Sequence, residues 1–260
     1  MKTNPTRTLM GAVAVSVALL VSACGASGGS EDASADQKTT TTKAEATTTT
    51  TTAAEETTTT EAAVDDDAQA RADSVDLTTS DFPDGWTATA PSEDDQDSPL
   101  KDCDPSFSDD DAKLAKHSTD DFSLGSLDEA DGTQFAAETV VFVDAGTADA
   151  AVEVLNDADV VACLDEALQE LLATSTGLEI EGALEDDDIG EIGTDNQAGV
   201  SATYVLTADD GSTVNATVAL LAMSTGDVGT MVTILSLGDS LDPTTLGGPI
   251  QALADLQIEA

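Results

Sequence analysis

Few residues of this chain could do covalent or acid–base chemistry. Its 260 residues include one histidine, His117, and three cysteines. His117 follows Lys113 and Lys116 closely, a pattern typical of the polar end of a surface helix and not of a catalytic triad. Ser98 and Lys101 match the Ser-x-x-Lys pattern of penicillin-recognising enzymes, but the companion Ser-Asp-Asn and Lys-Thr-Gly motifs are absent. We therefore expect no catalytic residue and no enzymatic activity.

Metal binding has limited support in the sequence. A zinc site needs His or Cys ligands that this chain does not supply. Acidic residues gather between Asp102 and Asp111 and again over Glu185–Asp188, so calcium is harder to dismiss. Neither cluster has the spacing of an EF-hand loop, and clusters of acids are expected in so acidic a chain. We predict a solvated acidic surface with no metal and no cofactor, and calcium stays open as the alternative.

Cys24 follows a segment with the features of an export signal. Lys2 and Arg7 precede the apolar stretch Leu9–Ala23, which is short for a membrane span. That stretch ends with Leu20-Val21-Ser22-Ala23-Cys24. This ending resembles the lipoprotein box of bacterial lipoproteins, which implies a signal peptide over 1–23, acylation of Cys24, and a lipid anchor on the extracytoplasmic face of the cell membrane. The alternative is an ordinary signal peptide with a chance cysteine.

The other two cysteines, Cys103 and Cys163, are candidates for a disulfide. Exported proteins meet an oxidising compartment in which such bonds persist. A bridge between them would close a loop of about 60 residues and contribute about 4 kcal/mol in the chain-entropy model. We predict this disulfide, with two free thiols as the alternative.

The charge of the chain excludes some partners. There are 52 acidic and 8 basic residues, which gives a formal net charge of −44. Such a surface repels phosphate, so nucleic acid and anionic headgroups are poor ligands. No Lys or Arg follows Lys116. Amphipathic or cationic ligands are therefore favoured over anionic ones.

Residues 24–75 have the composition of a linker. Runs of threonine dominate, and there are no aromatic and almost no large aliphatic side chains. A segment that cannot bury apolar surface does not fold alone, so we predict a disordered Thr-rich tether after the lipidated N-terminus. A glycosylated stalk and an unmodified spacer both fit this composition.

Residues 76–260 carry the periodic patterns of one α+β domain. Alternating apolar residues predict a mostly antiparallel sheet. Its strands are expected over 134–143, 178–184, 200–206, 214–222 and 228–237. About three helices are expected on one side of it, over 148–155 with Thr147 as N-cap, over 160–172, and from near Pro243.

One face of this sheet is a candidate binding surface. The strands over 134–143 and 228–237 are apolar on both faces. The helix over 160–172 can cover only one face of the sheet that they form. We predict a shallow apolar cleft rimmed by acids on the other face. The alternative is that Phe82, Trp86 and Phe107 fold over this face and fill it.

The domain resembles a family of secreted proteins. The resemblance is carried by Leu77, Phe82-Pro83-Asp84-Gly85-Trp86, Cys103, Val140-Val141-Phe142 and Cys163. These features are similar to actinobacterial sensor-type domains, of which the extracellular domain of PknH-type receptor kinases is the best-known example. The resemblance implies an α+β fold with a cleft, a ligand-sensing role and two disulfides, whereas this domain has cysteines for one. A PsbP-like α+β lipoprotein fold fits nearly as well.

Together these features predict a membrane-anchored cell-envelope lipoprotein. Its exported domain is expected to bind or sense a small ligand or an envelope protein without catalysis. The alternative is a structural envelope protein that docks on a neighbouring membrane protein. No residue identifies the ligand.

Overall fold

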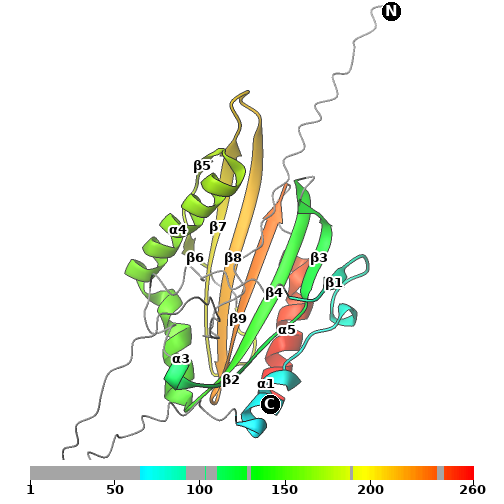
Figure 1. Ribbon diagram of the computed structural model, residues 1–260, viewed down its shortest axis with the longest axis vertical. Coiled ribbons are helices and arrows are strands. Elements are labelled where there is room, and N and C mark those ends of the chain that lie inside the picture. Colours follow the sequence, from blue (N-terminus) through cyan, green and yellow to red (C-terminus); the bar gives the residue numbers. More distant parts are fainter. Residues whose placement is uncertain (1–64, 92–102, 104–109, 128–129, 188–189, 239–242) are drawn as a thin grey trace, which may run out of the picture. The chain divides into compact units, whose positions relative to one another are not determined.

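The computed structural model describes residues 65–91, 103, 110–127, 130–187, 190–238 and 243–260. These residues form an α+β arrangement in which helices pack on a nine-stranded sheet (Figure 1). The predicted fold class is therefore confirmed. The strands are β1 Thr87–Thr89, β2 Lys113–Ser118, β3 Asp121–Ser126, β4 Asp131–Phe142, β5 Glu179–Glu181, β6 Glu185–Asp186, β7 Asn196–Thr207, β8 Thr213–Thr225 and β9 Val228–Leu237. The described helices are α1 Asp66–Ser74, α3 Ala145–Glu153, α4 Ala158–Thr176 and α5 Pro243–Glu259.

The strands pair antiparallel throughout, in the order β1-β3-β4-β9-β8-β7-β5. Two short strands complete the sheet: β2 pairs with β4 beyond the end of β3, and β6 pairs with β7. Tight turns connect the long strands β7, β8 and β9, with Gly211 and Gly226 in the left-handed region. The meander predicted from the alternating apolar residues is present.

One face of the sheet, called here the α4 side, is covered by α3 and α4. The apolar residues of α4 recur every three or four positions, so they form one stripe along the helix. Leu164, Leu168 and Leu172 on this stripe are buried in the same cluster as Val200 and Tyr204 of β7. Full burial of each such leucine stabilises the domain by about 1.5–3 kcal/mol.

The opposite face, called the α5 side, is covered by chain over β3, β4 and β9. Four aromatic side chains fill it over β3 and β4, and Leu246 and Leu253 of α5 belong to the same cluster. The ring of Phe82 lies 4.3 Å from that of Phe122 and 4.8 Å from that of Trp86, measured between centroids. The predicted apolar cleft is therefore wrong, as is the placing of all helices on one side. Phe107 lies outside the described residues.

Two boundaries differ from those predicted. Helix α1 lies in the segment that the sequence assigns to the tether. The apolar pattern does not predict this helix, because its buried side chains are only two alanines, Ala68 and Ala72. Asp65 caps its first turn. The folded domain therefore begins about ten residues earlier than expected. At α3, Asp144 is the N-cap, since its carboxylate accepts a hydrogen bond from the backbone N–H of Thr147 at 2.9 Å. Thr147 is inside the first turn.

None of the described helices is long and apolar enough to cross a membrane.

Candidate functional site

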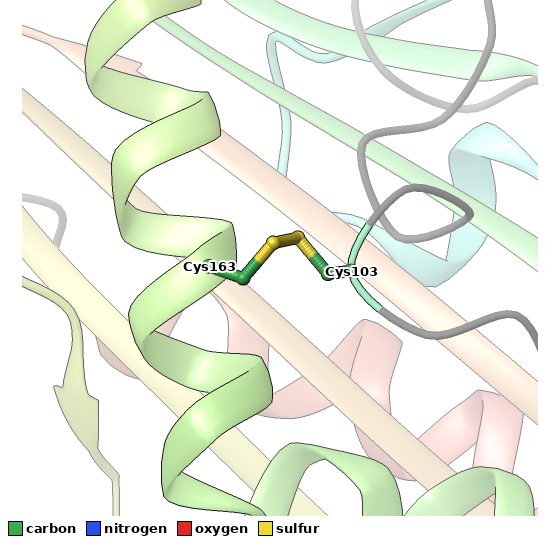
Figure 2. The surroundings of a disulfide bond; sticks show 2 residues. All are labelled: Cys103 and Cys163. Atoms are coloured by element: carbon green, nitrogen blue, oxygen red, sulfur yellow. A yellow bond between two sulfur atoms is a disulfide. The ribbon is translucent and has the colours of Figure 1, made fainter.

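The two predicted bridging cysteines are joined. Cys103 and Cys163, 60 residues apart, form a disulfide with their Cα atoms 5.5 Å apart. Cys163 lies on α4, so the bridge joins Cys103 to that helix (Figure 2). The predicted lipidation site, Cys24, lies outside the described residues.

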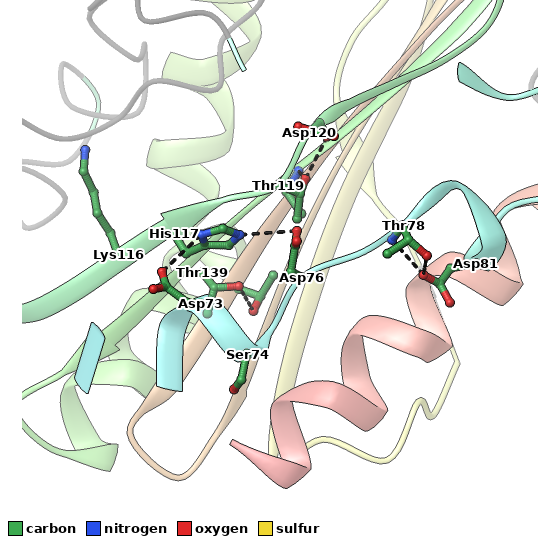
Figure 3. A network of polar contacts seen from close by, with 12 residues as sticks. Asp73, Ser74, Asp76, Thr78, Asp81, Lys116, His117, Thr119, Asp120 and Thr139 are labelled. Carbon is green, nitrogen blue, oxygen red and sulfur yellow. Dashed lines mark hydrogen bonds and ion pairs between the residues drawn. The ribbon is translucent and has the colours of Figure 1, made fainter. Parts of the chain in front are cut away.

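His117 is placed differently from its prediction. It belongs to β2, not to a helix end, and its side chain is 25% exposed. Its Nδ1 lies 3.3 Å from a carboxylate oxygen of Asp73, and its Nε2 lies 3.3 Å from one of Asp76 (Figure 3). Both ring nitrogens therefore face carboxylates from α1 and the residues after it. This arrangement ties α1 to the sheet.

Arg71 makes a second contact between α1 and the rest of the domain. Its guanidinium binds Asp227 of the β8–β9 turn through two parallel contacts, of 2.9 and 2.5 Å. Its Nε–H donates to the backbone carbonyl of Ala260 at 2.8 Å. The hydrogen bonds from Arg71 lower the pKa of the Asp227 carboxyl, and those to Asp227 raise the pKa of Arg71.

We call this region the α1 junction: Gln69, Arg71, Asp73 and Asp76 with the groups they contact. Gln69 completes it, because its Nε2 donates to the backbone carbonyl of Lys116 at 2.9 Å. Across the described residues, all Lys and Arg side chains, namely Arg71, Lys113 and Lys116, lie on α1 and β2. In this part of the chain, basic groups are thus limited to α1 and to β2, which pairs only with β4.

The acidic clusters do not assemble a metal site in the described residues. There, no three His, Cys, Asp or Glu side chains come together as metal ligands. Most of the predicted cluster between Asp102 and Asp111 lies outside the described part of the chain.

A second candidate region lies on the α5 side of the sheet, over β5, β6, β7 and the first half of β8. Residues paired across antiparallel strands project to the same face. Glu179 pairs with Thr207, Glu181 with Val205, and Glu185 with Ser201. We call this surface the open face. It consists of Glu179, Glu181, Glu185, Ser201, Thr203, Val205, Thr207, Thr213, Asn215 and Thr217.

The open face has an acidic edge and an uncharged centre. The three glutamates are exposed, as are Thr203 and Asn215. The hydroxyls of Thr203 and Thr217 lie 3.2 Å apart across β7 and β8. The described Lys and Arg side chains are on α1 and β2, and β2 is separated from β7 by β4, β9 and β8. The glutamates therefore have no described basic group of this domain beside them.

Helix α4 holds the acidic edge in place from the opposite side. The Asp165 carboxylate accepts hydrogen bonds from the Tyr204 hydroxyl at 2.7 Å and from the Leu184 backbone N–H at 2.9 Å. Gln169 donates to the carbonyl of Gly182 at 3.3 Å. Burial and the nearby Asp165 raise the pKa of Tyr204, so its hydroxyl stays a donor. The segment between β5 and β6 is thereby fixed to α4.

Gly182 allows the close approach that this attachment requires. Its φ of +155° is in a region that side chains disfavour, and a Cβ there would lie 2.7 Å from the Tyr204 ring. The segment can therefore pass directly over the ring of Tyr204, with Glu181 just before the crossing.

No protein-family model matches this chain, and no curated protein matches it. Among solved structures, the extracellular domain of PknH from Mycobacterium tuberculosis is similar, with a TM-score of 0.39 and 11% sequence identity over 73% of this chain and 96% of that chain.

Proposed function

We propose that this protein is a lipid-anchored protein of the cell envelope whose exported domain binds a partner and performs no chemistry. The box ending in Cys24 is the observation that carries the anchor. The Cys103–Cys163 disulfide supports an oxidising, extracytoplasmic location. The Thr-rich composition before residue 65 suits a spacer between membrane and domain.

The open face supports binding. It lies on sheet strands that no described helix covers on this side, and its hydroxyl and amide groups both donate and accept hydrogen bonds. Its acidic edge has no described basic neighbour, so the edge attracts a cationic partner and repels an anionic one. We therefore assign the partner to the cationic class, on an open surface in place of the apolar cleft expected from the sequence.

The surroundings of His117 support a non-catalytic domain. Each ring nitrogen of this single histidine faces a carboxylate of the chain itself. A general base needs a free nitrogen within reach of the proton it removes from a substrate. A structural role at the α1 junction accounts for these contacts.

Replacement of the acylated cysteine tests the anchor. In cells, Cys24→Ser is expected to move the protein out of the membrane fraction and to abolish incorporation of labelled palmitate. Release without any change in labelling, or full retention of an unlabelled protein in the membrane, would contradict lipid anchoring through Cys24. The Cys103→Ser, Cys163→Ser double variant serves as the control, because it should stay in the membrane fraction and stay labelled.

Binding is tested with a hexa-arginine peptide and the soluble Cys24→Ser protein at about 150 mM salt, where only close charges act strongly. The variant E179Q/E181Q/E185Q should weaken binding about fivefold or more. The matched variant D159N/E166Q/E170Q removes the same number of exposed charges from α4 and should weaken it less than about twofold. Equal weakening by both variants would mean that net charge alone attracts the peptide, and would overturn the assignment to the open face.

A further inference from the structure

Helix α1 is attached to the sheet by a weak apolar contact. Its buried side chains are Ala68 and Ala72, whereas α4 buries five leucines and valines. An alanine side chain contributes much less on burial than a leucine does, since the gain scales with the apolar area removed from water. A nine-residue helix is also too short to persist by itself in water. Apolar packing alone therefore holds α1 weakly.

The polar contacts of the α1 junction reach three separate parts of the domain. Gln69 binds the edge strand β2, and Arg71 binds both the β8–β9 turn and the C-terminal residue. Asp73 binds His117. Arginine's planar fork makes the Asp227 contact bidentate, the strongest form of such a pair. Attachment of α1 thus depends on a few polar contacts that can break together.

An apolar row belongs to the same buried cluster as α1. Ala115 of β2 pairs with Val141 of β4, and Val141 pairs with Val228 of β9, so these side chains lie side by side on the α5 side. All three share a cluster with Ala68 and Ala72. α1 makes most of its contacts within the domain with β2 and β4. Departure of α1 would uncover this row.

We propose that α1 is a latch, which detaches from the folded sheet as a unit and uncovers the row Ala115–Val141–Val228. The helix lies immediately after the Thr-rich segment, so a pull on that segment acts first on the α1 junction. The latch is a conformational device separate from the open face, and it does not depend on the lipid anchor. It gives the domain two states that differ in exposed apolar surface.

Hydrogen exchange on the full-length Cys24→Ser protein tests the latch. Amides of α1 should exchange at least about 100-fold faster than those of β4 and β9, because local opening needs less free energy than global unfolding. Arg71→Gln should speed α1 exchange about tenfold, a change of about 1.4 kcal/mol in opening. Arg71→Lys keeps the charge but not the planar guanidinium, so its rate of α1 exchange should fall between those of the parent and of Arg71→Gln. Exchange of α1 at the rate of the core strands would overturn the proposal.

A matched pair of glutamines provides the control. Gln69 and Gln251 each donate to an aspartate four residues on and to a distant carbonyl, of Lys116 and Ile192 respectively. Gln69→Ala should speed exchange of α1 alone, and Gln251→Ala should leave α1 unchanged. Equal effects of both variants on α1 would mean that it opens only with the whole domain, against the latch.

Trypsin gives a second measurement that does not require Arg71 to be replaced. The bond after Arg71 can be cut only when α1 is released, and residues 117–260 contain no Lys or Arg. His117→Gln keeps that bond and removes a contact of the latch, so it should increase cleavage after Arg71 several-fold while residues 117–260 stay intact. Unchanged cleavage would contradict a latch held by His117.

Discussion

The α5 side of the sheet has two halves with opposite properties. Over β3, β4 and β9 it is closed by four aromatic rings and by α5, and over β7 and the first half of β8 it is open and polar. Strand β8 crosses from one half to the other. Its residues on this side change from Thr213, Asn215 and Thr217 to Ala219, Leu221 and Met223. The point where a strand changes composition on one face therefore marks where the covering chain begins.

The largest difference between the halves is expected from paired truncations. Phe135 in the closed half is 0% exposed and contacts Phe82, so Phe135→Ala should lower the free energy of unfolding by about 3–5 kcal/mol. Val205 on the open face is only half-buried, so Val205→Ala should cost less than about 1 kcal/mol. Urea unfolding of both variants measures this. Similar losses would mean that the two halves are equally packed.

Removal of the disulfide separates global stability from the geometry of the open face. The Cys103→Ser, Cys163→Ser double variant should lose about 2–4 kcal/mol, because the unfolded chain regains the freedom of a loop of 60 residues. Below its melting temperature it should still bind hexa-arginine as the parent does, since Asp165 and Gln169 keep holding the acidic edge. Calorimetry and a binding titration together check this. Weaker peptide binding by the folded variant would show that the bridge also shapes the open face.

The smallest effect is expected at the α1 junction in acid. The hydrogen bonds from Arg71 lower the pKa of Asp227, so this pair contributes stability above the pKa of an unfolded aspartate, about 3.9, and loses it as pH falls through the lower pKa of the folded state. Both side chains are about 30% exposed, which limits the contribution to about 1 kcal/mol or less. The difference in α1 exchange between the parent and Asp227→Asn should therefore shrink from pH 6 to pH 3.

A control for this pH effect exists in the open half. The side chain of Ser212 lowers the pKa of Asp210 in the β7–β8 turn, yet Asp210 is remote from α1. Asp210→Asn should leave α1 exchange unchanged at every pH. An equal effect of the two substitutions would show that general charge, and not the Arg71 pair, governs the helix.

Long periodic elements were predictable from the sequence, and short ones were not. Helix α4 and strands β4, β7, β8 and β9 follow from apolar residues at regular spacing. Helix α1 was missed because its buried face consists of alanines in an acidic segment, a composition shared with linkers. Strands β1, β2 and β3 are short, and the β2 contacts that position His117 come from residues more than 40 positions away.

The open face could have been found in part. The change from Thr213, Asn215 and Thr217 to Leu221 and Met223 is visible in the sequence of one strand. The acidic edge of this surface could not be predicted. Its glutamates reach the open face because β5 and β6 pair with β7, and the sequence does not show which strands pair. The disulfide followed from counting cysteines in an exported chain. The cleft was wrongly predicted because nothing local to Phe82 and Trp86 tells which face they cover.

The burial of Trp86 and Tyr204 gives the protein two optical reporters. The chain has one tryptophan and one tyrosine, and they belong to the clusters on opposite sides of the sheet. Tryptophan emission therefore follows the aromatic cluster under α5, while ultraviolet absorbance at high pH follows the phenol under α4, whose ionisation is resisted while it stays buried. A single unlabelled sample can thus reveal whether the two layers of this domain come apart together or in sequence.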